Sequence, residues 1–302
     1  MDVAVTGSGG LIGRALVRRL QEGGHRVRRV VRSGGEGPDA VRWDPMVGTI
    51  DASALAGVDA VVNLGGEGIG DHRWTEAQKR RIRDSRVTGT TVLAEAMAAL
   101  EPRPSVLLNA SAVGYYGDRG DEVLTEASGP GTGFLSEVVQ AWEGATRPAA
   151  AAGIRTACFR TGIVLAAGGG ALAKQLPLFR FGLGGRLGSG TQWLPWIALE
   201  DEVGAIVHLL TADVEGPVNL AAPDPVTNAT FTEVLGRVLG RPSFLAVPAF
   251  GPRLLLGREL ADELLFSSAR MVPEKLRASG YQFALPELEG ALRSVLDRPA
   301  AA

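Results

Sequence analysis

The hydrophobic and polar positions of the first half of the chain alternate between two periods. Short apolar runs typical of strands occur at 2–6, 26–32, 40–43, 58–64, 106–110 and 156–165, and amphipathic helical patterns occupy 11–22, 75–100 and 133–147. The run VDAVVNL at 58–64 is apolar almost throughout, as in a strand that a parallel sheet buries on both faces. Strands that alternate with helices predict an α/β fold with a doubly wound (Rossmann) parallel sheet.

The pattern changes after about residue 166. Residues 168–190 are rich in glycine and aromatic residues, and prolines interrupt the helical patterns of 242–302. We therefore expect a Rossmann domain over 1–165, which also receives some later segments, and a smaller α+β C-terminal domain over 166–302.

The sequence TGSGGLIG at 6–13 lies between the first predicted strand and the first predicted helix. Glycines at Gly7, Gly10 and Gly13 allow backbone amides to approach a pyrophosphate, and the amino terminus of the helix adds a partial positive charge. We expect a dinucleotide site here; the alternative is a tight strand–helix turn without a ligand.

The end of the second strand indicates which dinucleotide to expect. An acidic residue at this position would bind the ribose hydroxyls of NAD, whereas an arginine accommodates the extra phosphate of NADP. The chain has Arg32, which can pair with that phosphate, and Ser33, which can donate a hydrogen bond to it. We predict NADP(H); the alternative for Arg32 is an ordinary surface arginine.

Arg86 supports this prediction because it lies on the apolar face of the third helical pattern, in line with Ile82 and Leu93. Thr75 and Gln78 look like a capping box at the start of this helix. An unpaired buried charge is costly, so either a cofactor phosphate or a protein carboxylate should neutralise Arg86. The residues expected to contact the cofactor are Gly7, Gly10, Leu11, Ile12, Gly13, Arg32, Ser33, Leu64, Gly65, Arg86 and Val164.

Composition narrows the class of protein further. The chain of 302 residues has a net charge of −2 and no basic tract, which predicts neither nucleic acid nor a membrane as partner. It lacks an apolar run of about 18 residues and a signal peptide, so we expect a cytoplasmic protein, monomer or homodimer. Cys158, the single cysteine, excludes an internal disulfide and should be buried filler, and the three histidines have no metal-binding spacing.

Further motifs follow the predicted strands and cover essentially the whole chain. They are NLGGE at 63–67, RW at 73–74, SR at 85–86, SAVGYYG at 111–117, FL and WE within 134–143, RTGIVL at 160–165, GLGGRLGSGTQWLPWI at 182–197 and APDPVTN at 222–228. In combination they resemble the SDR39U-type "epimerase family", an atypical branch of the extended short-chain dehydrogenases/reductases. The resemblance implies an extended short-chain fold and NADP binding, for a branch without an established substrate. Gly65 replaces the branch's usual alanine, and Ala198 replaces a common histidine, which weakens any mechanism through that histidine.

The superfamily places a Tyr-x-x-x-Lys pair on the helix after the fifth strand, where it handles protons and binds the nicotinamide ribose. This chain contains no such motif. If Trp142-Glu143 is aligned with the end of that helix, Leu135 and Val139 occupy the two positions.

Other polar groups are therefore the candidates for proton transfer. The resemblance places Ser111 where a hydroxyl bonds the reacting carbonyl, Tyr116 is close enough to reach the same pocket, and Glu67 is a possible base or substrate anchor. Packing in the loop is the alternative for Tyr116, and a structural carboxylate is the alternative for Glu67. Gln192, Trp193 and Trp196 are expected to line the substrate side, with core packing as the alternative for both tryptophans.

Two functions follow from these expectations. The first is an NADP(H)-dependent oxidoreductase or epimerase that acts on a small polar substrate. The second is a catalytically silent NADP-binding sensor or scaffold, which the loss of the Tyr/Lys pair favours.

Overall fold

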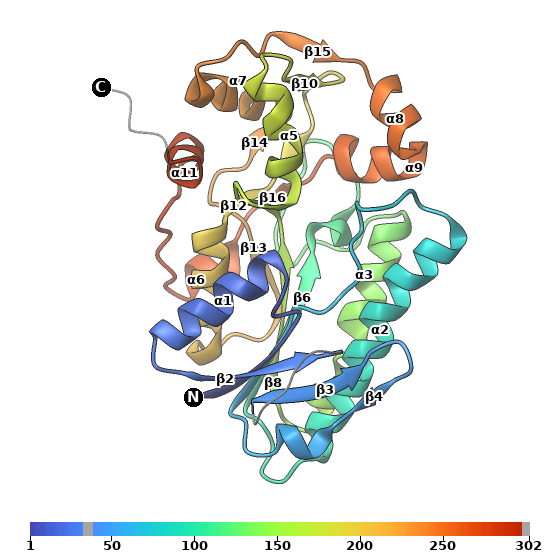
Figure 1. Cartoon of the computed structure of the whole chain (residues 1–302), viewed down its shortest axis with the longest axis vertical. Coiled ribbons are helices and arrows are strands. Elements are labelled where there is room, and N and C mark those ends of the chain that lie inside the picture. Colours follow the sequence, from blue (N-terminus) through green and yellow to red (C-terminus); the bar gives the residue numbers. More distant parts are fainter. Residues whose placement is uncertain (33–38, 298–302) are drawn as a thin grey trace.

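A computed structural model describes residues 1–32 and 39–297 (Figure 1). One eight-stranded sheet runs in the order β13-β8-β6-β5-β1-β2-β3-β4, and its pairings are parallel except for β3 with β4. Its strands are β1 (Asp2–Thr6), β2 (Arg26–Val31), β3 (Ala40–Asp44), β4 (Thr49–Ile50), β5 (Ala60–Asn63), β6 (Val106–Ala112), β8 (Arg155–Thr161) and β13 (Gly216–Leu220). The predicted Rossmann sheet is confirmed, and its strand order reverses at β1, where such sheets bind ligands.

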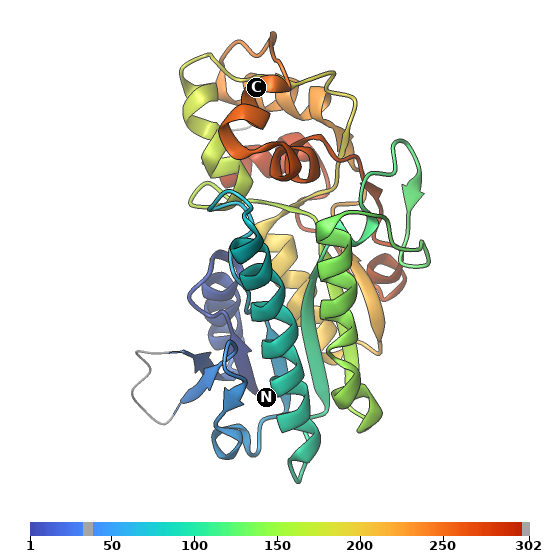
Figure 2. The ribbon, with the colours of Figure 1, turned by 90° about the vertical axis from the view of Figure 1, so that its right-hand side faces the viewer.

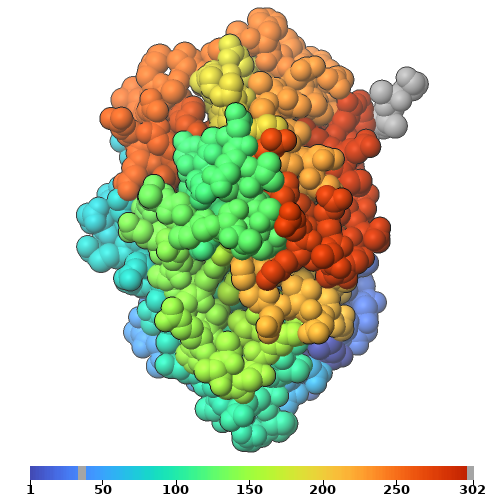
Figure 3. All heavy atoms as spheres, turned by 180° about the vertical axis from the view of Figure 1, so that it is seen from behind, coloured from blue at the N-terminus to red at the C-terminus, as the bar shows by residue number. Residues whose placement is uncertain are grey.

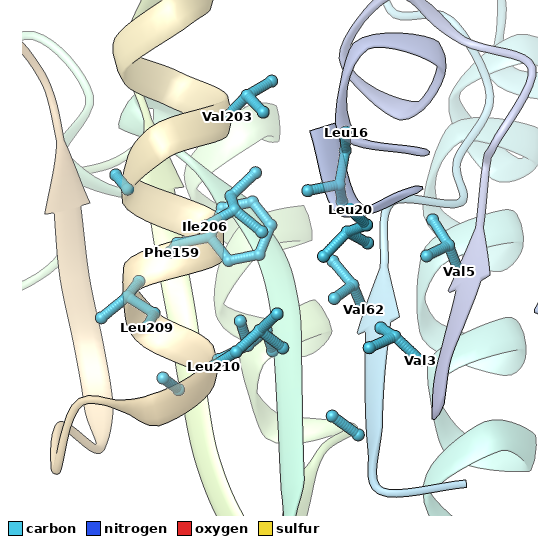
Figure 4. Packing of buried hydrophobic residues seen from close by; sticks show 14 of the residues in the cluster. Val3, Val5, Leu16, Leu20, Val62, Phe159, Val203, Ile206, Leu209 and Leu210 are labelled. Carbon is cyan, nitrogen blue, oxygen red and sulfur yellow. The ribbon is translucent and has the colours of Figure 1, made fainter. Parts of the chain in front are cut away.

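Helices cover both faces of this sheet (Figure 2). They are α1 (Leu11–Glu22) and α6 (Leu199–Thr211) on one face, and α2 (Glu76–Ala99), α3 (Phe134–Gly144) and the short α4 (Arg147–Ala151) on the other. Figure 4 shows the core between the sheet, α1 and α6, where Val5, Leu16 and Ile206 are fully buried. Burying an aliphatic side chain of this size contributes about 1.5–3 kcal/mol, so this core holds α1 and α6 against the sheet.

Two elements of the later half return to the sheet. Helix α6 packs against α1, and β13 forms the edge strand beside β8. Most of the other later segments surround a separate core that includes Trp196, Phe231 and Leu292, and we call these segments the second unit and the sheet with its helices the first unit. Their main elements are α5 (Gly170–Arg180), β10 (Gly185–Leu187), β12 (Trp196–Ala198), α7 (Asn228–Leu239), β15 (Leu245–Val247), α8 (Phe250–Leu256) and α11 (Leu288–Val295).

The strand predicted at 156–165 is divided at Gly162, which corrects the sequence-based expectation. Strand β8 ends at Thr161, and β9 (Ile163–Leu165) pairs with β12 outside the central sheet. A Cβ on Gly162 would lie 2.0 Å from the carbonyl oxygen of Pro195. Only glycine permits this close approach, which turns the chain from the sheet toward the second unit.

The remaining elements join the two units. Figure 3 shows the loop around 117–131 packed against the C-terminal segment, where β7 (Val123–Leu124) pairs with β16 (Arg270–Met271). Asp201, buried at the start of α6, accepts hydrogen bonds from the amides of Ala284 and Leu285 at 2.7 and 2.9 Å. The other short elements are η1 (Ala52–Leu55), η2 (Val113–Tyr116), β11 (Trp193–Leu194), β14 (Val226–Thr227), α9 (Arg258–Ala261), η3 (Asp262–Phe266) and α10 (Glu274–Ala278).

Candidate functional site

The glycine-rich loop between β1 and α1 forms a cradle without room for side chains. A Cβ on Gly7, whose φ is +61°, would lie 2.7 Å from the oxygen of Leu64, and one on Gly13 would lie 2.2 Å from the oxygen of Gly7. The amide of Gly10 donates to the Gly7 carbonyl at 2.9 Å. No side chain caps α1, so its first amides, from Leu11 onward, are available to a phosphate group.

A buried polar network ties this loop to the end of β5. The Thr6 hydroxyl donates to Asn63 Oδ1 at 2.7 Å and accepts from the amides of Leu64 and Gly65, both at 2.9 Å. The Asn63 amide in turn donates to Asn109 Oδ1 at 2.7 Å, so the ends of three neighbouring strands are held in register. This network fixes the two loops between which a dinucleotide would lie.

Trp43 explains why glycine occupies position 65. A Cβ at Gly65 would lie 3.0 Å from the indole ring of Trp43 and 3.2 Å from Thr6 Oγ1. Trp43 is nearly buried at the end of β3 and also lies against Gly89 of α2. The indole therefore fills the space that a methyl group at position 65 would need.

Arg86 lies beside the loop that follows β5. Its Nη1 donates to the carbonyls of Glu67 and Ile82 at 2.9 and 3.1 Å, and its guanidinium lies 5.0 Å from the Trp142 ring. Burial lowers the pKa of Arg86 to about 10, which Glu67 only partly opposes. Over residues 1–32 and 39–297 no carboxylate forms an ion pair with it, so this enclosed cation suits an anionic ligand.

The start of α2 differs in one detail from the predicted capping box. Thr75 caps the helix by accepting from the Gln78 amide at 3.2 Å, as expected. The Gln78 side-chain oxygen accepts from Arg81 instead of reaching back to Thr75. The helix is therefore capped from one side only.

The other expected cofactor contacts lie around the same edge. Ile12 of α1, Leu64 directly after β5 and Val164 of β9 are partly buried and pack against the core that Figure 4 shows. Arg32 is exposed at the end of β2, and Ser33 lies outside the described residues. The structure thus brings the glycine cradle, Leu64, Gly65, Val164 and Arg86 to one edge of the sheet.

A buried ion pair lies behind Ser111 at the end of β6. The Ser111 hydroxyl donates to Glu143 Oε1 at 2.6 Å, and Glu143 accepts two hydrogen bonds from Arg160 at 2.8 and 2.9 Å. Burial lowers the pKa of Arg160, but the hydrogen bonds and charge of Glu143 outweigh it and hold that pKa above its usual value. The pair joins α3 to β8 and positions the Ser111 hydroxyl.

The two tyrosines of the YYG sequence have different environments. Tyr116 is fully buried, and its hydroxyl lies 2.7 Å from Asn219 Oδ1, 3.0 Å from the Thr125 carbonyl and 3.0 Å from Arg160. Burial raises the pKa of this phenol, which Arg160 and Asn219 oppose. Without access to solvent Tyr116 has a structural environment, which matches the packing alternative.

Tyr115 is half-buried, and its ring centroid lies 3.4 Å from Arg160 Cζ. Its backbone carbonyl accepts from the Ser136 hydroxyl at 2.8 Å, which holds the backbone of Tyr115 against the first turn of α3. Tyr115, Glu143 and Arg160 were not predicted as site residues; the doublet YYG was the available signal for Tyr115. The residue with this phenol is thus bound through its backbone to α3, the helix on which Leu135 occupies the position of the usual tyrosine.

The positions of the missing pair belong to the core. Leu135 and Val139 are 8% and 3% exposed, and Glu263 accepts from the amides of Phe134 and Leu135 at 2.9 and 2.8 Å. Neither apolar side chain can transfer a proton. Glu67, by contrast, is partly exposed. Its backbone amide donates to the Ser85 hydroxyl at 3.1 Å, and this contact does not involve the side-chain carboxylate.

The expected substrate-side residues separate into two groups. Gln192 is 6% exposed, donates to the Leu265 carbonyl at 3.0 Å and lines a cavity of about 380 Å³. Trp193 donates at 2.7 Å to Asp121, which lines the same cavity. Trp196 is 1% exposed and belongs to the core of the second unit, so for this residue the core alternative holds.

Two further findings concern the chain as a whole. Cys158 is buried as predicted, and burial raises the pKa of its thiol to about 12. Among the helices of the described ranges, none has both the length and the apolar character needed to cross a bilayer.

The reversal of strand order at β1, the glycine cradle and Arg86, with which no carboxylate of the described residues pairs, define a Rossmann protein of the dinucleotide-binding class. Residues 3–221 match the "NAD dependent epimerase/dehydratase family", and residues 247–295 match "Domain of unknown function (DUF1731)". The chain therefore belongs to the NAD dependent epimerase/dehydratase family and is of the SDR39U1 type, as its motifs indicated.

Individual relatives span nearly the whole chain. An epimerase family protein of Mycobacterium tuberculosis is 46% identical over 298 residues, which cover 98% of both chains. Human epimerase family protein SDR39U1 is 37% identical, over 98% of this chain and all of its own. The crystal structure of the human protein (isoform 2) with NADPH has a TM-score of 0.90 at 35% identity, and the match covers 98% of this chain and 99% of that one.

Proposed function

We propose that the protein is an NADP(H)-dependent oxidoreductase or epimerase that acts on a small polar substrate without a Tyr-x-x-x-Lys pair. The observation that carries this proposal is the pairing of two features at one sheet edge. The glycine cradle beside Arg86, with which no carboxylate in 1–32 and 39–297 pairs, suits an anionic dinucleotide. Ser111 near the end of β6 and Tyr115 in the following turn lie after the strand that pairs with β5.

The cradle fits a dinucleotide on observations of this chain. A Cβ at Gly7 or Gly13 would collide with the backbone of Leu64 or of Gly7, so these glycines let the loop pack tightly beneath α1, whose first amides lack acceptors within the helix. The human relative crystallised with NADPH supports the same assignment. Arg32 and Arg86 would then bind the adenosine side, and the bound cofactor would supply hydride transfer.

Proton handling falls to Ser111 and Tyr115 in this proposal. Glu143 fixes the Ser111 hydroxyl, and the Arg160 guanidinium lies against the face of the Tyr115 ring, which holds the ring in place. Ser111 and Tyr115 thus take the role of the missing pair, whereas the Tyr116 hydroxyl accepts a hydrogen bond from Arg160 and helps to position it. Glu67 remains a candidate base or substrate anchor because it is partly exposed.

Replacing Arg32 with alanine should weaken NADPH binding roughly tenfold to hundredfold and change NADH binding less than about threefold. A charge-assisted hydrogen bond contributes about 1.5–3 kcal/mol, and only NADPH carries the phosphate that would receive it. Isothermal titration calorimetry with both cofactors measures the difference. Arg29→Ala, an exposed arginine on the same strand, is the matched control. Equal losses for both cofactors would show that Arg32 does not bind the phosphate.

Replacing Tyr115 with phenylalanine should reduce turnover at least roughly hundredfold while NADPH affinity stays unchanged, because a general acid is lost but no cofactor contact is. Turnover is followed by deuterium transfer from stereospecifically labelled NADPH to products of a metabolite extract. Tyr116→Phe serves as the contrast and should mainly lower stability. If Tyr115→Phe transfers label at the wild-type rate, Tyr115 is not the proton donor.

A second candidate is a catalytically silent NADP-binding sensor or scaffold. The burial of Leu135 and Val139 at the pair positions favours it. It requires that the wild-type protein transfers no label to any product and that NADPH changes its association with a partner protein. The labelling experiment therefore separates the two functions.

A further inference from the structure

The second unit carries an exposed apolar surface at the end of the molecule farthest from β4 (Figure 1). It is formed by Phe181, Leu183, Phe244, Phe250, Leu254 and Leu255, each between 58% and 83% exposed. Soluble proteins rarely leave so many large apolar side chains together in water unless the surface contacts something. We call these six residues the apolar surface.

Pairing of distant segments creates this surface. Strand β10 pairs with β15 from Gly185 opposite Leu245, and Pro242 lies 3.3 Å from the Cβ position of Gly182. Helix α8 follows β15 directly and has no buried residue. The apolar side chains of α8 are therefore not part of a buried core. Burial on folding does not explain why this exposed helix carries them.

The two segments that form the apolar surface carry only positive charges. Residues 178–190 and 240–258 contain five arginines and no aspartate or glutamate, in a chain with 31 basic and 33 acidic residues. Arg253 and Arg258 share Asp262 as a partner. Arg180 and Arg241 are exposed and form no ion pair within the described ranges. The rim of the apolar surface is thus cationic.

From this geometry we propose that the apolar surface and its arginine rim bind the surface of an anionic lipid membrane. Exposed aromatic and leucine side chains enter the boundary between headgroups and acyl chains, and guanidiniums bind the lipid phosphates. A symmetric dimer through this surface is disfavoured, because it would bring together Arg180 and Arg241 of two copies, and no carboxylate of the described residues pairs with these two arginines. A lipid bilayer is fluid and can accommodate side chains without a matching surface. Isolated exposed rings such as Phe181 and Phe244, which come from separate segments, can therefore insert into it.

This proposal departs from the expectation drawn from composition. The expectation relied on contiguous basic tracts, whereas these arginines come from two segments about sixty residues apart in the sequence. The β10–β15 pairing brings the two segments together. The net charge of −2 hides this local excess of positive charge.

The test is flotation of the full-length protein with vesicles of equal parts phosphatidylcholine and phosphatidylglycerol, compared with phosphatidylcholine alone. We expect binding to the anionic vesicles only, weakened by salt. Arg180→Gln/Arg241→Gln should reduce binding roughly 25-fold, since each arginine near an anionic surface contributes about fivefold. Phe250→Ser/Leu254→Ser should reduce it at least about tenfold, because two apolar anchors are lost.

Met46→Ser/Val47→Ser is the matched control, since these residues are also exposed but lie near β4 at the opposite end. It should bind vesicles like the wild type, and all variants should keep the wild-type melting temperature and NADPH affinity. The proposal is overturned if anionic vesicles do not bind the wild type, or if the Phe250/Leu254 variant binds equally well. Light scattering adds a third outcome: a dimer that the Phe250/Leu254 variant abolishes, without vesicle binding, would make the surface a protein interface instead.

Discussion

Replacing Arg160 with methionine should lower the free energy of unfolding by roughly 3–5 kcal/mol at neutral pH. Arg160 and Glu143 are 3% and 16% exposed as side chains, and their two hydrogen bonds at 2.8 and 2.9 Å join β8 to α3. Methionine fills most of the volume but leaves the Glu143 carboxylate with Ser111 as its remaining partner. Removing one member of a buried pair is costly because the other charge stays buried without its counterion.

Urea unfolding of the wild type and the variant measures this loss. Arg26→Met is the control, because Arg26 pairs with Asp39 at 2.7 Å but both side chains are about half exposed. An exposed pair of this kind contributes about 0–1 kcal/mol. Similar losses for the two variants would mean that the Arg160–Glu143 pair does not stabilise the fold.

Replacing Glu202 with glutamine should stabilise the protein by about 3 kcal/mol at pH 7. Glu202 is fully buried on α6, accepts one hydrogen bond from Thr161 at 2.8 Å and has no partner for Oε2 in the part of the chain that the structure describes. Burial raises the pKa of this carboxyl from 4.5 to about 8, and the hydrogen bond from Thr161 opposes the shift only in part. The folded protein therefore keeps a proton that the unfolded chain releases.

The sign of the pH dependence follows from that difference. Below about pH 4.5 both states are protonated and Glu202 costs nothing; the cost grows as pH rises to about 8 and is constant above it. Each pH unit within this window changes stability by about 1.4 kcal/mol. Glutamine does not titrate, so the gain from Glu202→Gln should be near zero at pH 4.5 and largest above pH 8.

Urea unfolding at several pH values tests this expectation. Glu200→Gln is the matched control, since Glu200 is exposed on the same helix turn. It should show no comparable gain at any pH. A gain for Glu202→Gln that is independent of pH would show that the carboxyl is not protonated in the folded state.

Much of the first unit could be predicted from the sequence because its signals are local. The strand at Asp2–Thr6 and the helix at Leu11–Glu22 have the predicted bounds, since apolar periodicity and flanking glycines mark both ends. The apolar run that contains β5 likewise identified a central strand. Such signals depend only on residues that are neighbours in sequence.

The sequence did not reveal those features that contacts between distant segments decide. The division of the strand at Gly162 depends on Pro195, a contact that no periodicity reveals. The burial of Tyr116 instead of Tyr115 depends on Asn219 and Arg160, which lie far from it in sequence. Trp196 belongs to the second core because β12 pairs with β9. Adjacent aromatic residues cannot be ranked by exposure until their partners are known.

The route of the chain between the two units has a consequence for dissecting the protein. Because the backbone leaves the sheet at Gly162 and returns with α6 and β13, a cut near residue 166 would strip the N-terminal piece of its edge strand and of half of one helical layer. Neither fragment should therefore fold alone, and the two should fold only when they are mixed and associate. A fragment that ends near residue 166 would therefore be unsuitable for binding or crystallisation experiments. A minimal cofactor-binding fragment should extend through β13, so that it includes α6 and the segment between residue 166 and α6.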